Sequence, residues 1–163
     1  MILQIIFNIS KRVGNREAAS TGLRGEKGGL SWTEQGFRFA WHVMLIEKTG
    51  QVDFRVVDND DGSNWVVYPR EHLSALQHRM MSTQPDMILS FAHHLEDEWN
   101  AKGHLDVSVY ADAWASLNGR RRQRLIDPDV DLSEQREGWG QKTWIVPLND
   151  SPKARREISV GER

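Results

Sequence analysis

Apolar and polar residues alternate in two early parts of the chain, which predicts antiparallel β-strands. Residues 37–46 and 52–57 place an apolar side chain at every second position, as a strand with one buried face requires. Residues 48–50 are expected to form the short hairpin loop between these strands. The polar segment 58–64 then predicts a solvated turn before a third strand at residues 65–68, so that the three strands form a meander.

Helical spacing replaces this alternation in the middle of the chain. Residues 70–81 are mostly polar, with apolar residues three or four positions apart, and this pattern predicts a helix. A stronger helix is predicted from Pro85 to Gly103, with Ser82 or Thr83 as its cap. Its apolar stripe, which we expect to dock on the sheet, consists of Ile88, Phe91, Ala92, Leu95 and Trp99.

Residues 112–132 contain two alternating segments joined at Asn118 and Gly119, and this arrangement predicts a β-hairpin. The Asn-Gly pair supplies the two positive φ angles that a type I′ turn needs. One face of the first segment is small and apolar, and the other is aromatic and polar. A loop at residues 134–143 that carries Trp139 is expected to cover the aromatic face. The alternative is an aromatic groove that accepts an extended peptide by strand addition.

Arginines are concentrated just after the predicted turn. On a regular extended strand, Arg120, Arg122 and Arg124 share one cationic face. Nearby aspartates favour a network of cross-strand ion pairs as the ordinary interpretation. The functional alternative is recognition of an acidic partner, either anionic lipid headgroups or a glutamate-bearing peptide, because guanidinium groups bind carboxylate and phosphate in a bidentate manner. We expect Trp114 and Asn118 to belong to the same contact surface.

The composition fits a single soluble domain with a substantial core. The chain has 163 residues, of which 39% are hydrophobic, and seven tryptophans supply large buried surfaces. With 21 Lys plus Arg against 23 Asp plus Glu, the net charge of −2 disfavours a nucleic-acid partner. The absence of cysteine excludes disulfides and thiolate chemistry. The predicted fold is mainly β with docked helices, an α+β class with an antiparallel β-sandwich-like domain.

The two ends of the chain lack the patterns of the central part. Residues 1–28 contain scattered charge and several glycines, and we expect a disordered or unrelated leader there. No secretory signal is evident, and no apolar run approaches the ~20 residues that a membrane-spanning helix needs. Residues 150–163 are expected to form a flexible tail.

Few residues are candidates for catalysis or metal binding. His93, His94 and Glu98 raise the alternative of a small metal-dependent hydrolase, but adjacent helical positions diverge by about 100° and a further ligand would have to come from elsewhere. We therefore interpret the two histidines as surface or boundary residues. The sequence contains no recognisable nucleophile arrangement and no glycine-rich phosphate loop. It assigns no catalytic residue, metal ligand or cofactor to this chain.

Residues 112–132 also carry a resemblance to a known family. Their pattern, D-x-W-x-S-[IL]-N-x-R-x-x-Q-R-[IL]-x-D-P-x-V-D-[IL], resembles a signature of the vitamin K-dependent γ-carboxylase family. Further blocks between Gly29 and Leu148 resemble, in family order, the soluble domain of bacterial members of the horizontally transferred transmembrane (HTTM) type. The matching residues, which we expect to be structural, are Trp32, Gly36, Trp41, Pro85, Asp86, Asp112, Ser116, Gln123, Asp127, Pro128, Asp131, Trp144 and Pro147.

The resemblance implies a role that this chain would not perform alone. Members of the family are membrane proteins that carboxylate peptidyl glutamate as carbon-carbon lyases, and their chemistry uses reduced vitamin K inside a transmembrane bundle. Residues 29–149 would be an accessory domain on the extracytoplasmic side, with the bundle or a polypeptide substrate as partner. The domain would meet the membrane only through its parent protein. The sequence resembles the soluble domain without the transmembrane bundle, and the favoured explanation is a truncated gene product. The alternative is a standalone protein-interaction module.

Overall fold

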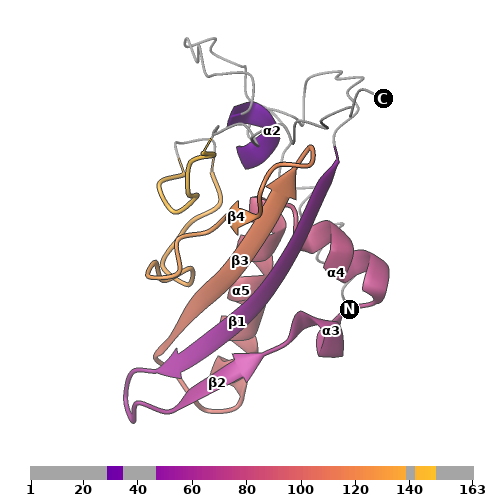
Figure 1. Cartoon of the computed structure of the whole chain (residues 1–163). Coiled ribbons are helices and arrows are strands. Elements are labelled where there is room, and N and C mark those ends of the chain that lie inside the picture. Colours follow the sequence, from indigo (N-terminus) through magenta and orange to yellow (C-terminus); the bar gives the residue numbers. More distant parts are fainter. Residues whose placement is uncertain (1–28, 35–46, 139–141, 150–163) are drawn as a thin grey trace, which may run out of the picture.

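An antiparallel sheet lies at the centre of the fold. The computed structural model describes residues 29–34, 47–138 and 142–149. Within these residues, four strands form one sheet in the order β2-β1-β3-β4 (Figure 1). The strands are β1 (Lys48–Asp58), β2 (Asn64–Val67), β3 (Val107–Leu117) and β4 (Gln123–Arg124).

The pairing of β1 with β3 is the longest in the sheet. Each residue from Lys48 to Asp58 has an antiparallel partner on β3, from Leu117 back to Val107. The predicted alternation of residues 52–57 and of the segment before Asn118 is confirmed, because apolar side chains of β1 and β3 are buried on one shared face. β2 joins β1 through the turn at residues 59–63, so the predicted turn is confirmed as well.

The first predicted hairpin loop is wrong, because residues 48–50 begin strand β1. Gly50 is needed for a close approach rather than for a turn. A Cβ atom at this position would lie only 2.0 Å from the carbonyl oxygen of Ser82. The preceding predicted strand, residues 37–46, lies outside the described residues.

The predicted helix over residues 70–81 is two short helices, α3 (Pro69–His72) and α4 (Ala75–Met81). Ser74 separates them because it caps α4. Its Oγ accepts the backbone N–H of Gln77, and the Gln77 side chain accepts the backbone N–H of Ser74, which is a capping box. A further short helix, α2 (Gly29–Thr33), comes first in the described chain.

The long helix α5 (Pro85–Ala101) confirms the strongest helical prediction. Its N-cap is Gln84, so the expected capping by Ser82 or Thr83 is wrong. Gly103 follows the helix with φ +104°, a conformation that favours glycine and stops the helix. The whole predicted stripe is buried, namely Ile88, Phe91, Ala92, Leu95 and Trp99.

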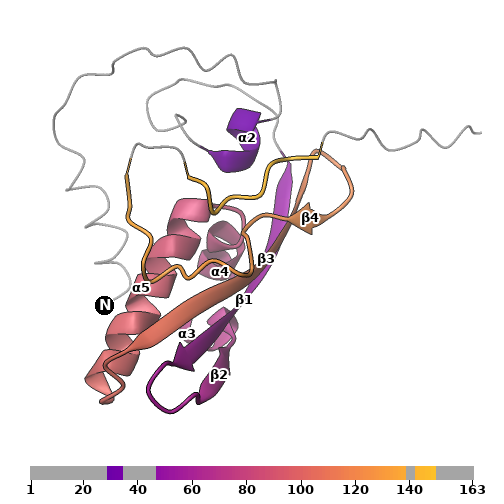
Figure 2. The same ribbon diagram turned by 90° about the vertical axis from the view of Figure 1, so that its left-hand side faces the viewer.

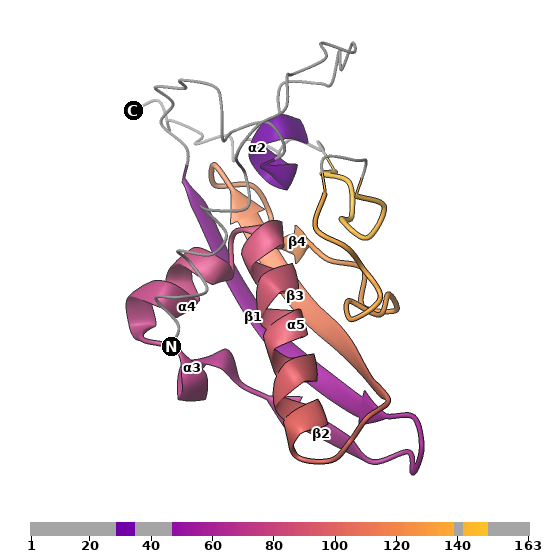
Figure 3. The ribbon, with the colours of Figure 1, turned by 180° about the vertical axis from the view of Figure 1, so that it is seen from behind.

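The core lies between α5 and one face of the sheet. Figures 2 and 3 show α5 running along this face, across β1 and β3. Phe54 and Phe91 meet there, with ring centroids 5.1 Å apart. The segment after β4 closes the edge of β3, since Leu125 donates its N–H to the carbonyl of Ala113 and Leu132 donates to Val109. Both leucines are fully buried.

These elements establish an α+β fold built on an antiparallel sheet. The predicted second layer of a sandwich is not confirmed. The described residues form one sheet, and outside its strands they add a single isolated bridge between Ile126 and Ile145. Trp139, which was expected to cover the aromatic face, lies outside the described residues.

The turn after β3 has the predicted positive φ angles, but its second arm is irregular. Asn118 has φ +49° and Gly119 has φ +69°, and Arg120 donates its N–H to the carbonyl of Leu117. A two-residue loop would place Arg122 opposite Ala115, but Gln123 has that position. The second arm therefore contains one extra residue, as in a β-bulge. Arg120, Arg122 and Arg124 were predicted to lie on one regular strand, but β4 contains only Gln123 and Arg124, so the regular strand is wrong for Arg120 and Arg122.

Candidate interaction surface on the sheet

The sheet face opposite α5 carries no helix among the described residues, and it is turned toward the viewer in Figure 1. Several large side chains on it are exposed to solvent, among them Val66, which is 56% exposed. We call this surface the open face. Its residues are Gln51, Asp53, Arg55, Val66, Tyr110, Asp112, Trp114, Arg122 and Arg124.

Trp114 and Arg124 form a cation-π stack on the open face. They are direct partners across β3 and β4, and the Arg124 guanidinium carbon lies 5.1 Å from the centroid of the Trp114 ring. The indole N–H of Trp114 donates to an Asp112 carboxylate oxygen at 2.9 Å. The same oxygen lies 3.9 Å from Arg124, whose side chain is 40% exposed, while that of Asp112 is 60% exposed. An exposed pair at this distance leaves the guanidinium available for another anion.

A second stack of the same kind lies at the other end of the open face. Arg55 pairs with Tyr110 across β1 and β3, and its guanidinium carbon lies 4.9 Å from the phenol ring centroid. Val66 lies on the other side of Arg55, on edge strand β2. The contact holds the guanidinium of Arg55 over the ring, where it can still donate hydrogen bonds to a ligand.

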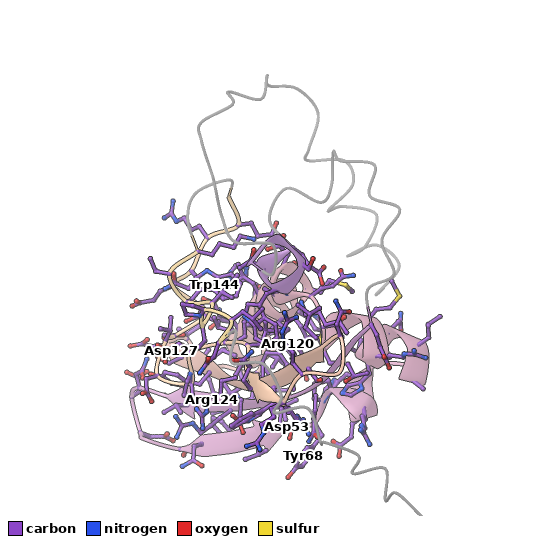
Figure 4. All side chains as sticks on the ribbon, turned by 45° about the horizontal axis from the view of Figure 1, so that its top comes forward. Asp53, Tyr68, Arg120, Arg124, Asp127 and Trp144 are labelled. Carbon is purple, nitrogen blue, oxygen red and sulfur yellow. The ribbon has the colours of Figure 1, made fainter. Side chains whose placement is uncertain are left out.

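Two carboxylates lie between the stacks. Asp53 and Asp112 are direct cross-strand partners, so like charges face each other at the centre of the open face. The pairing of Phe54 with Val67 puts Tyr68 beside Asp53, and Figure 4 shows these two side chains close together. Arg122 reaches the same face and donates to the side-chain oxygen of Gln51 at 3.0 Å.

The structure brings together only some of the residues predicted for a partner surface. Trp114, Arg122 and Arg124 lie on the open face, whereas Asn118 and Arg120 belong to the turn. The side-chain oxygen of Asn118 accepts the backbone N–H of Glu47 at 2.9 Å, and the backbone N–H of Asn118 donates to the Glu47 carbonyl. Asn118 therefore ties the turn to the residue that precedes β1.

Ser116 and Gln123 stabilise the same turn region. The Ser116 hydroxyl donates to the carbonyl of Arg120 at 2.6 Å. The Gln123 side-chain oxygen accepts the backbone N–H of Asn149 at 2.9 Å. These contacts give two of the motif residues a positioning role beside the open face.

The aspartates of the motif organise the segment that covers the edge of β3. A single Asp131 carboxylate oxygen accepts the backbone N–H of Val109 and both donors of Ser133. It thereby takes the place of a strand carbonyl beside β3. Asp127 accepts the N–H of Asp129, and its own N–H donates to the carbonyl of Trp144. Figure 4 shows where Asp127 and Trp144 lie relative to Arg124.

Most of the remaining motif residues that the structure describes are buried or bonded to other parts of the fold. Trp32 is fully buried and donates its indole N–H to the carbonyl of Val146 at 2.7 Å. Asp86 forms an ion pair with Lys142. Pro85 and Trp144 are buried, Pro128 is half-buried, and Pro147 is exposed. Gly36 and Trp41 lie outside the described residues.

Lys48 packs beside Trp32 at the start of β1. Its Nζ donates to the carbonyl of Trp32 at 2.8 Å and to Glu34 at 3.0 Å. Burial lowers the pKa of the Lys48 ammonium, while the Glu34 carboxylate opposes this shift. Lys48 thus has a structural role at one end of the sheet.

The histidines on α5 have separate partners. His93 is within hydrogen-bond distance of the Gln135 carbonyl, at 2.8 Å, and Glu98 forms an ion pair with Lys102. The His94 ring packs beside Phe91. Across the described parts of the chain, no group of three or more His, Asp or Glu side chains could hold a metal ion.

Sequence reasoning missed the part of the open face that β1 contributes. It did not single out Arg55 and Asp53, because each is ordinary within its own strand. Their polar alternation with buried neighbours was a signal that they share a solvent-facing surface. The pairing of β1 with β3, which brings Arg55 beside Tyr110, joins segments about 55 residues apart.

The fold and the open face define a small α+β domain in which one face of the sheet is not covered by a helix among the described residues. The family model for the lumenal domain of vitamin K-dependent gamma-carboxylase matches residues 25–151, and the chain belongs to this family. No solved structure matches the chain. Among the helices of the described residues, none has the length and apolar character to cross a membrane.

Proposed function

We propose that this chain is an accessory domain that supports peptidyl-glutamate carboxylation without being catalytic alone. It would present a polypeptide to a transmembrane reaction centre or stabilise that centre on the extracytoplasmic side of the membrane. The membership in the lumenal-domain family supports this role. In a full-length parent, of the bacterial HTTM type, reduced vitamin K would supply the strong base that carboxylation requires, and it would act in the transmembrane part.

The observation that carries the proposal is the position of Trp114, Arg122 and Arg124 on the open face. Two guanidinium groups and an aromatic ring are displayed together on a sheet whose other face is fixed by the core. Guanidinium forks bind carboxylates well, and a rigid sheet holds them in place at little entropic cost. A glutamate-bearing polypeptide fits this chemistry.

The proposal predicts that the variant Arg122→Glu plus Arg124→Glu stays folded but loses binding to a glutamate-rich peptide. Reversing two charges replaces attraction by repulsion, and the effect should weaken with added salt because the groups are exposed. The measurement is a low-salt pulldown with the immobilised peptide, together with a thermal melt. The matched control is Arg79→Glu plus Arg136→Glu, which changes the net charge equally at exposed positions outside the open face.

Three outcomes are informative. Unchanged binding by the open-face variant would reject the contact role, and unfolding of that variant would assign the arginines to structure instead. Turnover of a glutamyl peptide by the purified chain, with no membrane component present, would reject the statement that it is not catalytic alone.

A further inference from the structure

The open face has a regular pattern of charge that specifies its ligand more closely. We propose that it binds an extended polypeptide segment with carboxylates four residues apart and a basic residue midway between them. The proposal rests on the proposed function and adds Arg55, Tyr110, Asp53 and Asp112 to the contact surface. The pattern of such a ligand is E-x-K-x-E.

The spacing follows from the two stacks. Both aromatic rings belong to β3, at Tyr110 and Trp114, and each carries a guanidinium from a neighbouring strand. Four residues of a strand span about 13 Å. An extended ligand that runs along β3 has the same rise per residue, so its side chains at positions i and i+4 reach Arg55 and Arg124.

The residue between them follows from the aspartate pair. Asp112 lies halfway between Tyr110 and Trp114 on β3, two residues from each, and Asp53 is its direct partner on β1. A carboxylate in the middle of the ligand would meet two like charges, whereas a lysine would relieve their mutual repulsion. The open face therefore presents positive, negative and positive charge in sequence, and its complement is negative, positive and negative.

The aromatic rings make the arrangement rigid enough to discriminate spacing. A guanidinium stacked on a ring loses part of its side-chain freedom before any ligand binds, so less order has to be imposed on binding. The alternation of side chains along an extended ligand turns the intervening x residues away from the surface. Selectivity then depends on three positions.

The test compares two peptides of identical composition by calorimetry at low salt, one with the order E-x-K-x-E and one with the order K-x-E-x-E. We expect the first to bind more tightly. The variant Arg55→Gln should weaken its binding about fivefold, the upper range for one exposed ion pair. Arg136→Gln removes an exposed charge outside the open face and should leave binding unchanged.

The variant Asp53→Asn plus Asp112→Asn provides a second, independent measurement. It should reduce the preference between the two peptides, because the central lysine loses its partners. Equal affinity of the unchanged protein for both peptides, or dependence on Arg124 without dependence on Arg55, would overturn this inference and leave the proposed function standing. Absence of binding to either peptide, and to any glutamate-rich peptide, would overturn both.

Discussion

The Asp58 carboxylate shows how a single side chain holds together parts of the fold that are distant in sequence. It lies buried at the end of β1, accepts the backbone N–H of Asp60 at 2.8 Å, and lies 2.6 Å from His104 beyond α5. These hydrogen bonds, led by that from Asp60 and followed by that from His104, lower the pKa of Asp58. The His104 ring in turn packs edge-on against Trp65 of β2, with centroids 4.9 Å apart.

This arrangement predicts an acid-dependent effect of Asp58→Asn. The pKa of Asp58 is lower in the folded than in the unfolded protein, so its carboxylate stabilises the fold at any pH above the unfolded-state pKa. This contribution is lost as the pH falls through the folded-state pKa. We expect Asp58→Asn to be less stable than the unchanged protein at about pH 5. The difference in the free energy of unfolding should shrink toward about pH 3, which is below the ordinary pKa of an aspartate. Urea unfolding curves at both pH values measure it.

The matched control for this prediction is Asp60→Asn, since Asp60 is exposed on the same turn. It should behave like the unchanged protein at both pH values. An Asp58→Asn variant with an equal loss of stability at both pH values would show that the carboxylate charge is not what stabilises the turn.

Asp131 shows the same principle at the opposite edge of the sheet. Its carboxylate occupies the position of a strand carbonyl and satisfies the N–H of Val109, which would otherwise face the covering segment without a strand partner. The motif residues Asp127 and Asp131 are therefore explained by backbone hydrogen bonding. The ion-pair network that the sequence suggested for the arginines is reduced to one long contact between Arg124 and Asp112 among the described residues.

Among the secondary-structure elements, the contact of β1 with the turn between α4 and α5 predicts a strict requirement for glycine. Gly50→Ala would place a Cβ atom 2.0 Å from the Ser82 carbonyl oxygen, and this backbone atom cannot move without shifting the helices. Overpacking of this kind destabilises by about 1–3 kcal/mol. Urea unfolding should show a loss in this range, whereas Thr49→Ala, at an exposed neighbouring position, should change stability by less than about 0.5 kcal/mol. A neutral Gly50→Ala would show that this turn does not pack tightly on β1.

Local sequence patterns predicted the elements but not their long-range pairing. The alternation of Val107–Leu117 and the stripe of α5 are visible within one segment, because each element must bury one face. The capping box at Ser74 and Gln77 was also readable as a Ser-x-x-Gln pattern, and it would have split the first predicted helix. Gly50 suggested a loop because glycine is common in turns, and its close contact with Ser82 becomes visible only in the folded chain.

The candidate site was predicted in part for the same reason. Trp114 and Arg124 lie on one hairpin, so sequence proximity was enough to associate them. Arg55 and Tyr110 come from strands separated by three helices, and no local pattern indicates that they stack. The extra residue after Gly119 is not visible in the sequence. It places Arg124 rather than Gln123 opposite Trp114, and a shift of one residue in a strand exchanges its two faces.

For the whole molecule, the architecture predicts an uneven distribution of stability. β1 and β3 are the inner strands, pair along their full lengths and are covered by α5, whereas β2 and β4 form the edges of the sheet. Amides in the centres of β1 and β3 should therefore exchange with solvent only on global unfolding, and those of the short edge strands should exchange through local openings. Hydrogen–deuterium exchange followed by mass spectrometry resolves these segments.

A core variant distinguishes global from local opening in this experiment. Leu95 is fully buried between α5 and the sheet, so Leu95→Ala should lower stability by about 3 kcal/mol and accelerate the slowest amides on the order of 100-fold. Amides of β2 that already exchange locally should change little, and Leu76→Ala, at a position 67% exposed, should change neither group. If β2 were as protected as β1 and responded equally to Leu95→Ala, the edge strand would open only with the core. The open face and its edge would then be a rigid part of the core unit, and ligand binding there would require no local ordering of β2.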